Sequence, residues 1–138
     1  TNYNHPNVGK SAVKILEALD YEVRLVDKKC CGRPLISKGL LESAKKNAEY
    51  NINSIYEYVK DGAIVVGVEP SCISALKDEY PDMFPEDKRT NLIAESTYLL
   101  QELIVKESKD KKFNFKKSDE NKSEIIPNIN LNIIPHKF

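Results

Sequence analysis

Apolar residues recur along the first part of the chain with the periods of alternating helices and strands. Residues 8–19 carry them at helical spacing, and residues 21–26 alternate apolar with polar side chains, as in a strand with one polar face. Residues 40–59 carry a longer helical stripe, for which Ser37 is the expected N-cap. Residues 63–68 are apolar throughout and rich in β-branched side chains, which is typical of a strand covered on both faces.

These segments form a strand, a helix and a second strand, and this order has a geometric consequence. Two strands joined by a crossover helix run parallel, and the crossover is almost always right-handed. The loops that follow the two strands therefore open on the same edge of the sheet. We predict an α/β fold with a mostly parallel sheet and flanking helices, built from βαβ units.

The pattern after the second strand predicts two further helices. A short helix begins near Ser71 and is followed by a turn-rich break over residues 80–85, which contains two prolines. A longer helix is predicted over residues 88–105, with Asp87 as its N-cap. Residues 125–134 then provide one more strand, whose length two prolines limit.

The composition of the chain excludes several classes of protein. Its 138 residues are 41% hydrophobic, as in an ordinary soluble domain with one core. Lysine plus arginine and aspartate plus glutamate both total 21, so the net charge gives no reason to expect binding to nucleic acid or to an anionic membrane surface. The sequence shows neither a signal peptide nor an apolar run of the roughly eighteen residues that span a membrane. We therefore expect a cytoplasmic protein with no transmembrane segment and no nucleic-acid partner.

The chain has three cysteines, and all of them follow predicted strands. Cys30 and Cys31 come after the first strand and are followed by Gly32, whereas Cys72 comes just after the second strand. The βαβ geometry brings the two loops to one edge of the sheet, so the cysteines can share a ligand although they are far apart in sequence. Thiolates gathered there can hold a soft metal or an iron–sulfur cluster, or exchange electrons as a disulfide.

The residues around the cysteines favour the thiolate form. Three basic residues flank the adjacent pair, namely Lys28, Lys29 and Arg33. Cys72 lies near a predicted helix N-terminus, and both basic neighbours and a helix N-terminus stabilise negative charge on sulfur. Gly32 leaves room for a bulky cluster to approach the backbone. These are the conditions that an iron–sulfur site needs, and we predict the three cysteines as its ligands.

The number of cysteines leaves other interpretations open. A closed cluster or a tetrahedral zinc site has four protein ligands, and the chain has three cysteines. His136 is a further candidate ligand, although a histidine near a chain end is more often exposed to solvent. In a second hypothesis Cys31 and Cys72 form a redox-active disulfide, which requires their Cα atoms to lie within about 7 Å. A third is a non-catalytic docking domain with inert cysteines, because a buried cysteine usually behaves as a small hydrophobic residue.

Three short runs of sequence resemble a known family. They are residues 30–35, residues 67–72 and residues 77–81, together with Ala44 and Ala48 on the helix between the first two. Over residues 5–105 the chain resembles the CCG, or cysteine-rich domain, family. It looks most like the version fused behind FAD-linked oxidases of the D-lactate, glycolate and D-2-hydroxyglutarate dehydrogenase type. Related domains occur in heterodisulfide reductase and in the cysteine-rich subunits of anaerobic glycerol-3-phosphate dehydrogenase.

This resemblance implies an electron-transfer module of an oxidoreductase. It implies an iron–sulfur cluster of the 4Fe–4S kind, with Cys30, Cys31 and Cys72 as ligands beside Gly32. The module would pass electrons from a flavin that oxidises a 2-hydroxy acid to quinone or another acceptor. FAD is implied for the parent protein and not for this chain, so we expect the chain to be inactive alone. The implied partners are an FAD-linked oxidase domain or subunit and a second CCG half-domain, in a parent complex that is cytoplasmic or peripheral to the membrane.

The resemblance also implies how the chain is divided. Residues 1–106 correspond to the first CCG half-domain, residues 107–124 are too polar to bury and are interpreted as a linker or insertion, and residues 125–138 as a strand leading toward a second half. Members with a noncubane cluster have a cysteine before the first helix and a Cys-x-x-Cys at the end of the half. Here no cysteine precedes Cys30, and Ala75 stands where the last one would be. We therefore expect a piece of a longer protein whose other segments complete the ligand set.

Overall fold

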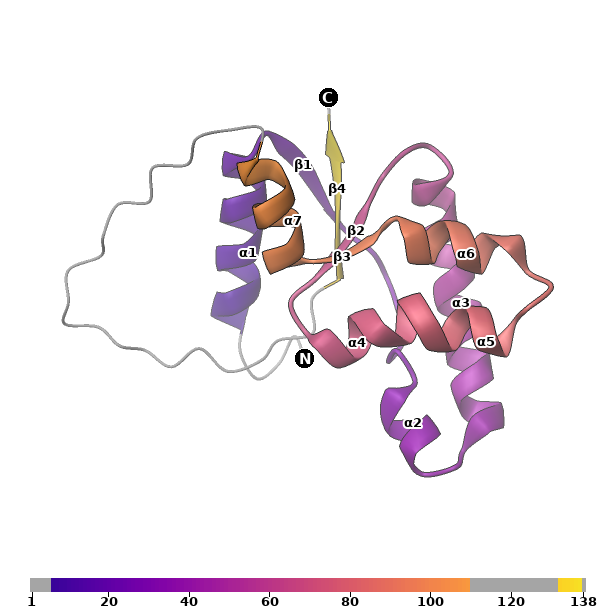
Figure 1. Ribbon diagram of the computed structural model, residues 1–138. Coiled ribbons are helices and arrows are strands. Elements are labelled where there is room, and N and C mark those ends of the chain that lie inside the picture. Colours follow the sequence, from indigo (N-terminus) through magenta and orange to yellow (C-terminus); the bar gives the residue numbers. More distant parts are fainter. Residues whose placement is uncertain (1–5, 110–131, 138) are drawn as a thin grey trace.

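The computed structural model describes residues 6–109 and 132–137. The strands in these residues are β1 (Tyr21–Leu25), β2 (Val65–Gly67), β3 (Thr97–Leu99) and β4 (Asn132–Lys137). They form one sheet with the order β1-β4-β2-β3 (Figure 1). β2 and β3 pair in parallel, and β4 pairs antiparallel with both β1 and β2. Because β1, β2 and β3 therefore point the same way, the predicted α/β fold is confirmed.

The position of β4 differs from what the crossover alone suggests. β4 lies between β1 and β2, so the two strands joined by the crossover are not direct neighbours. Pro135 does not end β4, as we expected, but lies inside it, opposite Val23 of β1. The pairing with β2 covers only Asn132 and Ile133, so β4 has a single strand neighbour where the proline stands. A proline without an N–H donor is tolerated at such an edge.

Helices cover both faces of the sheet. They are α1 (Pro6–Ala18), α2 (Arg33–Ser37), α3 (Leu41–Val59), α4 (Pro70–Ser74), the π-helical turn η1 (Ala75–Glu79), α5 (Tyr80–Met83), α6 (Lys88–Glu95) and α7 (Leu100–Ser108). α1 and α7 lie on one side of the sheet, and α3, α4, α5 and α6 lie on the other (Figure 1). No helix in the described part of the chain is long and apolar enough to cross a membrane.

Two clusters of buried side chains fill the space between the sheet and its helices. Val65 belongs to the cluster formed with α3, α4, η1, α5 and α6, and its neighbour Val66 belongs to the cluster formed with α1 and α7. Both valines are fully buried. Successive residues of a strand point to opposite faces, so the prediction of a strand covered on both sides is confirmed.

The prediction of one long helix over residues 88–105 was wrong, because a short strand, β3, interrupts it. α6 ends at Glu95, Thr97–Leu99 pairs with β2 as β3, and α7 begins at Leu100. The Thr97 hydroxyl donates to the Ile93 carbonyl (2.6 Å), which closes the end of α6. A β-branched and an aromatic residue at Thr97 and Tyr98 suit a strand, and β3 satisfies the peptide groups of β2 that a helix would leave unpaired.

The break expected over residues 80–85 was also wrong in part, because the helical path continues to Met83. The π-helical turn η1 precedes it, and the Tyr80 amide donates to the Ala75 carbonyl five residues back. Pro81 then falls in the first turn of α5, directly after the π-helical turn, at a position where proline is tolerated. The single helix predicted from Ser71 is therefore a continuous run of α4, η1 and α5.

The predicted helix caps had different outcomes. Asp87 caps α6 by accepting a hydrogen bond from the Arg89 amide (3.0 Å), as expected. Ser37 does not cap the long helix, because it ends the short helix α2, and the N-cap of α3 is Leu40. α7 continues to Ser108, beyond the expected start of the linker. The rest of that linker and residues 125–131 of the expected strand lie outside the described residues.

Candidate functional site

The structure brings two of the three predicted cysteine ligands into contact. Cys31 lies in the loop between β1 and α2, and Cys72 lies in the first turn of α4, just after β2. Their side chains are 3% and 4% exposed and belong to one buried cluster. The Cys72 thiol donates a hydrogen bond to the Cys31 sulfur, with 3.0 Å between the two Sγ atoms. The crossover geometry therefore joins the two loops as the sequence predicted.

The 3.0 Å between the two sulfurs falls between two reference distances. It is longer than the roughly 2.05 Å of a disulfide, and both cysteines are in the reduced state. It is shorter than the roughly 3.7 Å that separates two thiolates on one tetrahedral metal with bonds of about 2.3 Å. Cys31 and Cys72 therefore form a hydrogen-bonded pair that is neither a disulfide nor spaced like two ligands of one tetrahedral metal.

The surroundings of Cys31 hold it as the thiolate. The hydrogen bond from Cys72 is the largest of the effects that lower the pKa of Cys31 to about 6, against the opposing effect of burial. The backbone N–H of Arg33, the charge of Lys28 and the thiol of Cys30 lower this pKa further. The same hydrogen bond, together with burial, raises the pKa of Cys72. The pair therefore favours a proton on Cys72 and negative charge on Cys31.

The adjacent residues Cys30 and Cys31 differ in exposure, and Gly32 forms the turn that follows them. Cys30 is exposed to solvent, whereas Cys31 is buried. Gly32 has a φ of 93°, a left-handed conformation that strains any residue with a Cβ, and it precedes the first turn of α2. A Cβ on Gly32 would stand 3.5 Å from the Ala44 Cβ, an ordinary contact. Gly32 is therefore needed for the conformation of the turn more than for its lack of a side chain. The turn directs the Arg33 amide toward Cys31.

Glu69 and Ser71 fix the start of the helix that carries Cys72. The Glu69 side chain accepts hydrogen bonds from the Ser71 amide (3.4 Å) and from the Ser71 hydroxyl (2.6 Å). Glu69 is the N-cap of α4, and Pro70 stands in its first turn, where proline is favoured. The Glu69 side chain therefore acts as a helix cap.

The structure adds an ion pair that the sequence did not suggest. Arg33, directly after the cysteine–glycine turn, pairs with Glu79 of η1. η1 continues the helix that begins at Cys72, so this pair joins the two cysteine-bearing segments at the surface. The Arg33 side chain is 44% exposed, and exposed pairs of this kind contribute little to stability. No periodicity in the sequence points to it, because its two residues lie on separate elements.

Asn51 and Tyr80 are two further buried residues that the sequence analysis missed. The Asn51 side chain contacts the cysteine loop and the Tyr80 hydroxyl, and both residues are nearly inaccessible to solvent. Burial raises the pKa of Tyr80, and the charges of the three cysteines raise it further. A signal was present in the sequence, since Asn51 lies on the buried stripe of α3, where a polar residue requires partners.

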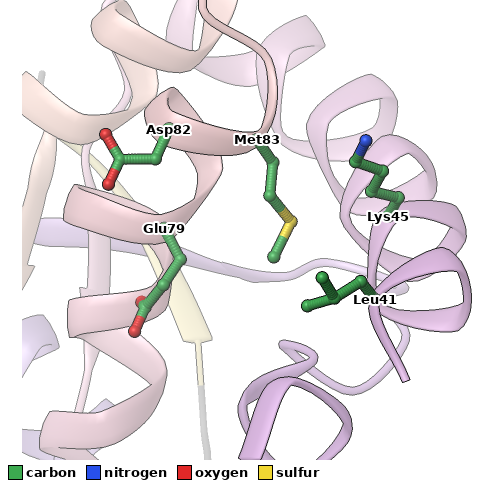
Figure 2. Close-up of a pocket in the computed structure, with 5 residues that line it drawn as sticks. All are labelled: Leu41, Lys45, Glu79, Asp82 and Met83. Carbon is green, nitrogen blue, oxygen red and sulfur yellow. The ribbon is translucent and has the colours of Figure 1, made fainter. Parts of the chain in front are cut away.

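A hollow of about 270 Å³ lies beside the site, between α3 and the η1–α5 segment. Leu41 and Met83 point into it from opposite sides, and Lys45, Glu79 and Asp82 complete its lining (Figure 2). One carboxylate oxygen of Glu79, Oε2, is buried without a hydrogen-bond partner among the described residues. The hollow therefore adjoins the Arg33–Glu79 pair rather than the two buried sulfurs.

The described residues do not form a complete metal centre by themselves. Within residues 6–109 and 132–137, no group of three or more His, Cys, Asp or Glu side chains is arranged to hold a metal ion. His136, the further candidate ligand, lies in β4 opposite Glu22, and its side chain lies outside the described part of the structure. The two buried sulfurs have the chemistry of soft-metal ligands, but they are only two of the four ligands that a closed site has.

Comparison with known proteins identifies the family. The family model of the cysteine-rich domain, CCG, matches residues 1–77. The chain is 43% identical over 90 residues to the C subunit of anaerobic glycerol-3-phosphate dehydrogenase from Escherichia coli K12, covering 64% of this chain and 23% of that protein. It is 35% identical over 104 residues to lactate utilization protein A of Bacillus cytotoxicus, covering 72% of this chain and 41% of that protein.

The same match recurs at 34% identity in lactate utilization protein A of Bacillus thuringiensis. The chain thus spans less than half the length of these curated relatives. No solved structure matches it. The resemblance seen in the cysteine motifs is confirmed, and the chain belongs to the CCG cysteine-rich domain family.

Proposed function

We propose that this chain is the first half of an iron–sulfur electron-transfer module in an oxidoreductase. One observation carries the proposal: Cys31 and Cys72 meet as a buried thiolate and thiol, 3.0 Å apart, at the shared edge of the strands that precede them. A thiolate that persists at neutral pH is the form that binds soft metals. The names of the relatives, one a dehydrogenase component and the other a lactate utilization protein, support a role in oxidation and reduction.

In this proposal Cys30, Cys31 and Cys72 provide three thiolate ligands, with Gly32 shaping the turn between them. A bound iron–sulfur cluster, 4Fe–4S in the full assembly, supplies a centre that takes up and releases one electron at a time. The protein keeps water away from the Cys31 and Cys72 sulfurs through burial. The Arg33 amide and the charge of Lys28 stabilise negative charge at the same place. The remaining ligands come from outside the described residues.

The partners of the module follow from the same family. We propose an FAD-linked oxidase domain or subunit that oxidises a 2-hydroxy acid, a second CCG half-domain, and quinone or another electron acceptor. The parent complex is cytoplasmic or peripheral to the membrane, and the chain alone has no turnover. The relatives are considerably longer than the matched region, which leaves room in them for a second half.

Anaerobic reconstitution tests the proposal. The chain, and the full-length protein that contains it, are incubated with ferrous iron and sulfide, and bound iron, bound sulfide and the EPR spectrum are measured. We expect Cys31→Ser and Cys72→Ser each to lose most of the bound iron, whereas Ser74→Ala, a change two residues from Cys72, keeps it. Iron content and EPR that stay the same in both cysteine variants would contradict the assignment of these ligands.

The 3.0 Å distance between the sulfurs also favours a second candidate function, thiol–disulfide exchange. The Cys31 thiolate would attack a small-molecule disulfide of the glutathione class and release one thiol. Cys72 would then give up its proton and displace the second thiol, so that two protein thiols and one disulfide become one protein disulfide and two thiols.

Oxidised glutathione distinguishes the two functions. If exchange is the function, the metal-free chain loses two hydrogens in mass and yields a linked Cys31–Cys72 peptide rapidly and reversibly. A chain that forms only a mixed disulfide at the exposed Cys30 would contradict this second candidate.

A further inference from the structure

Asn51 makes an unusual set of contacts for a single buried side chain. It projects from α3 toward the cysteine loop and is 2% exposed. Its Oδ1 accepts a hydrogen bond from the Lys29 amide (2.8 Å). Its Nδ2 donates to the carbonyls of Lys29 (3.2 Å) and Cys30 (3.3 Å) and to the Tyr80 hydroxyl (2.9 Å). Every polar atom of the amide is therefore used at the loop or at Tyr80.

The contacts to Lys29 have the form of a strand pairing made by a side chain. The amide of Asn51 accepts from the N–H and donates to the C=O of the same residue, as a neighbouring strand would. The loop has left β1 at this point, so its peptide groups need partners that the sheet does not supply. Asn51 supplies them and thereby fixes the backbone that leads into Cys30 and Cys31.

Tyr80 connects this clamp to the segment that carries the other cysteine. It begins α5, and α5 continues without interruption from α4 and η1, where Cys72 lies. Its side chain is fully buried in the same cluster as Cys31 and Cys72. The Asn51–Tyr80 hydrogen bond therefore joins the two cysteine segments in the buried interior, whereas the Arg33–Glu79 pair joins them at the surface.

A second contact from α3 holds the outer side of the loop. The Tyr50 hydroxyl donates to Asp27 (2.9 Å), and the Lys29 ammonium group lies 4.7 Å from the centre of the Tyr50 ring. Tyr50 is exposed, so these contacts are screened by solvent and weaker than those of its buried neighbour Asn51. Two successive residues of one helix thus hold the loop, and the buried one reaches the sulfur-bearing end.

We propose that Asn51 and Tyr80 are positioning residues of the cysteine site. Together they fix the loop so that Cys30 faces solvent while Cys31 lies against Cys72. The role of Asn51 and Tyr80 rests on the proposed function, in which Cys30, Cys31 and Cys72 are ligands of one cluster. The placement itself does not depend on a bound metal, and it can be measured without one.

The test compares two tyrosine variants in the metal-free, reduced chain. Tyr80→Phe keeps the ring and removes the hydroxyl that Asn51 contacts. Tyr21→Phe is the matched control, because it also removes a buried tyrosine hydroxyl, which donates to Glu107 (2.7 Å) on the opposite face of the sheet. Asn51→Asp is the stronger variant, since it places a carboxylate against two carbonyl oxygens. Iodoacetamide labelling is followed at each cysteine by mass spectrometry, with folding checked by circular dichroism.

We expect Cys30 to react fast and Cys31 slowly in the unaltered chain and in Tyr21→Phe. In Tyr80→Phe the ratio of the Cys31 rate to the Cys30 rate should rise about fivefold, the change that loss of one hydrogen bond of ordinary strength makes in a local opening equilibrium. Asn51→Asp should raise it further. An equal ratio in Tyr80→Phe and Tyr21→Phe would overturn the inference, even if Asn51→Asp failed to fold.

Loading with ferrous iron and sulfide separates this inference from the proposed function. If the unaltered chain and full-length protein bind no iron, the proposed function fails while the labelling ratio still decides the positioning role. If they bind iron, Tyr80→Phe should alter the EPR spectrum of the bound iron and Tyr21→Phe should not. The reverse order of effects would overturn the positioning role and leave the cysteine ligands supported.

Discussion

The two faces of the sheet bury neighbouring residues of the same strand, β2, in different surroundings. On the α1 and α7 face, Val66 packs among mostly aliphatic side chains, and Tyr21 donates a buried hydrogen bond to Glu107. On the α3 face, Val65 packs in a cluster that also holds Cys31 and Cys72. The two buried thiols thus lie on one face. The comparison indicates that the first face mainly stabilises the fold, while the second also builds a site.

The two faces differ in how they hold the backbone as well. α1 is a single amphipathic helix of 13 residues that covers its face without interruption. On the other face the long helix α3 covers the sheet, but the cysteines themselves lie in a loop after β1 and on the short helix α4, which a π-helical turn follows. Short, irregular segments contribute little stability of their own and depend on specific hydrogen bonds. Substitutions on the two faces should therefore separate stability from thiol chemistry.

The largest expected effect comes from Leu16→Ala in α1. Leu16 is fully buried, and removing such a side chain lowers the free energy of unfolding by about 2–5 kcal/mol. Urea unfolding measures the loss. While the variant is folded, the relative labelling rates of Cys30 and Cys31 should stay unchanged, since Leu16 lies on the opposite face. A selective rise at Cys31 would show that the two faces are not separable.

Gly32→Ala should act on the cysteine face at a smaller cost. The left-handed φ of 93° disfavours alanine by about 1–2 kcal/mol, seen as a lower free energy of unfolding in urea. Because Gly32 sets the turn after Cys31, the variant should also label faster at Cys31. Gly62→Ala is the matched control, with a φ of 92° at the end of α3 and nothing within 4 Å of the new Cβ. Equal labelling rates of Cys31 in Gly32→Ala and Gly62→Ala would show that the turn at Gly32 does not position Cys31.

The cysteine pair should make stability depend on pH. The lowered pKa of Cys31, about 6, means that at pH 7 the folded pair holds one proton and the unfolded chain holds two. The pair therefore stabilises the fold increasingly as pH rises from about 6 toward the ordinary cysteine pKa near 8.5, by at most roughly 1.4 kcal/mol per pH unit. This contribution disappears as pH falls through 6.

Above the ordinary cysteine pKa the trend should reverse. Cys72, whose pKa is raised, keeps its proton in the folded chain after both thiols of the unfolded chain have lost theirs. Stability due to the pair then declines with pH. Urea unfolding of the reduced chain at several pH values checks this, and Cys72→Ala should flatten the rise between pH 6 and 8. If Cys72→Ala showed the same dependence of stability on pH as the unaltered chain, this would argue against a thiolate at Cys31.

Arg33→Ala should have the smallest effect. The Arg33–Glu79 pair is exposed on the arginine side, so its loss should lower the free energy of unfolding by less than about 1 kcal/mol. Lys60→Ala breaks the exposed Lys60–Glu57 pair at the end of α3 and serves as the control. Faster labelling of Cys72 only in Arg33→Ala would show that the pair holds the two cysteine segments together. A large loss of stability would contradict its surface role.

Regular elements and the meeting of the cysteines could be predicted from the sequence. Periodicity located α1, β1, α3 and β2, and the crossover rule placed Cys31 and Cys72 at one edge, where they do meet. These features depend on local pattern and general topology. β3 could not be predicted in the same way, because residues 97–99 become a strand only through pairing with β2.

The supports of the site depend on contacts between distant residues, which a single sequence does not show. The Asn51–Tyr80 hydrogen bond joins residues 29 positions apart and is invisible to periodicity. Asn51 alone could have been noticed as a polar residue on an apolar stripe, but its partners could not. The left-handed turn at Gly32 and the difference in exposure between Cys30 and Cys31 are likewise not revealed by composition.

The most direct test of the account is whether the exposed cysteine joins the two buried ones in a single site. The sample is the reduced full-length protein that contains this chain. Cys30 is labelled with iodoacetamide before and after anaerobic loading with ferrous iron and sulfide. We predict that loading protects Cys30 together with Cys31 and Cys72, and that removing the iron with a chelator restores its reactivity. Cys30 that reacts equally fast with bound iron would contradict the three-thiolate site.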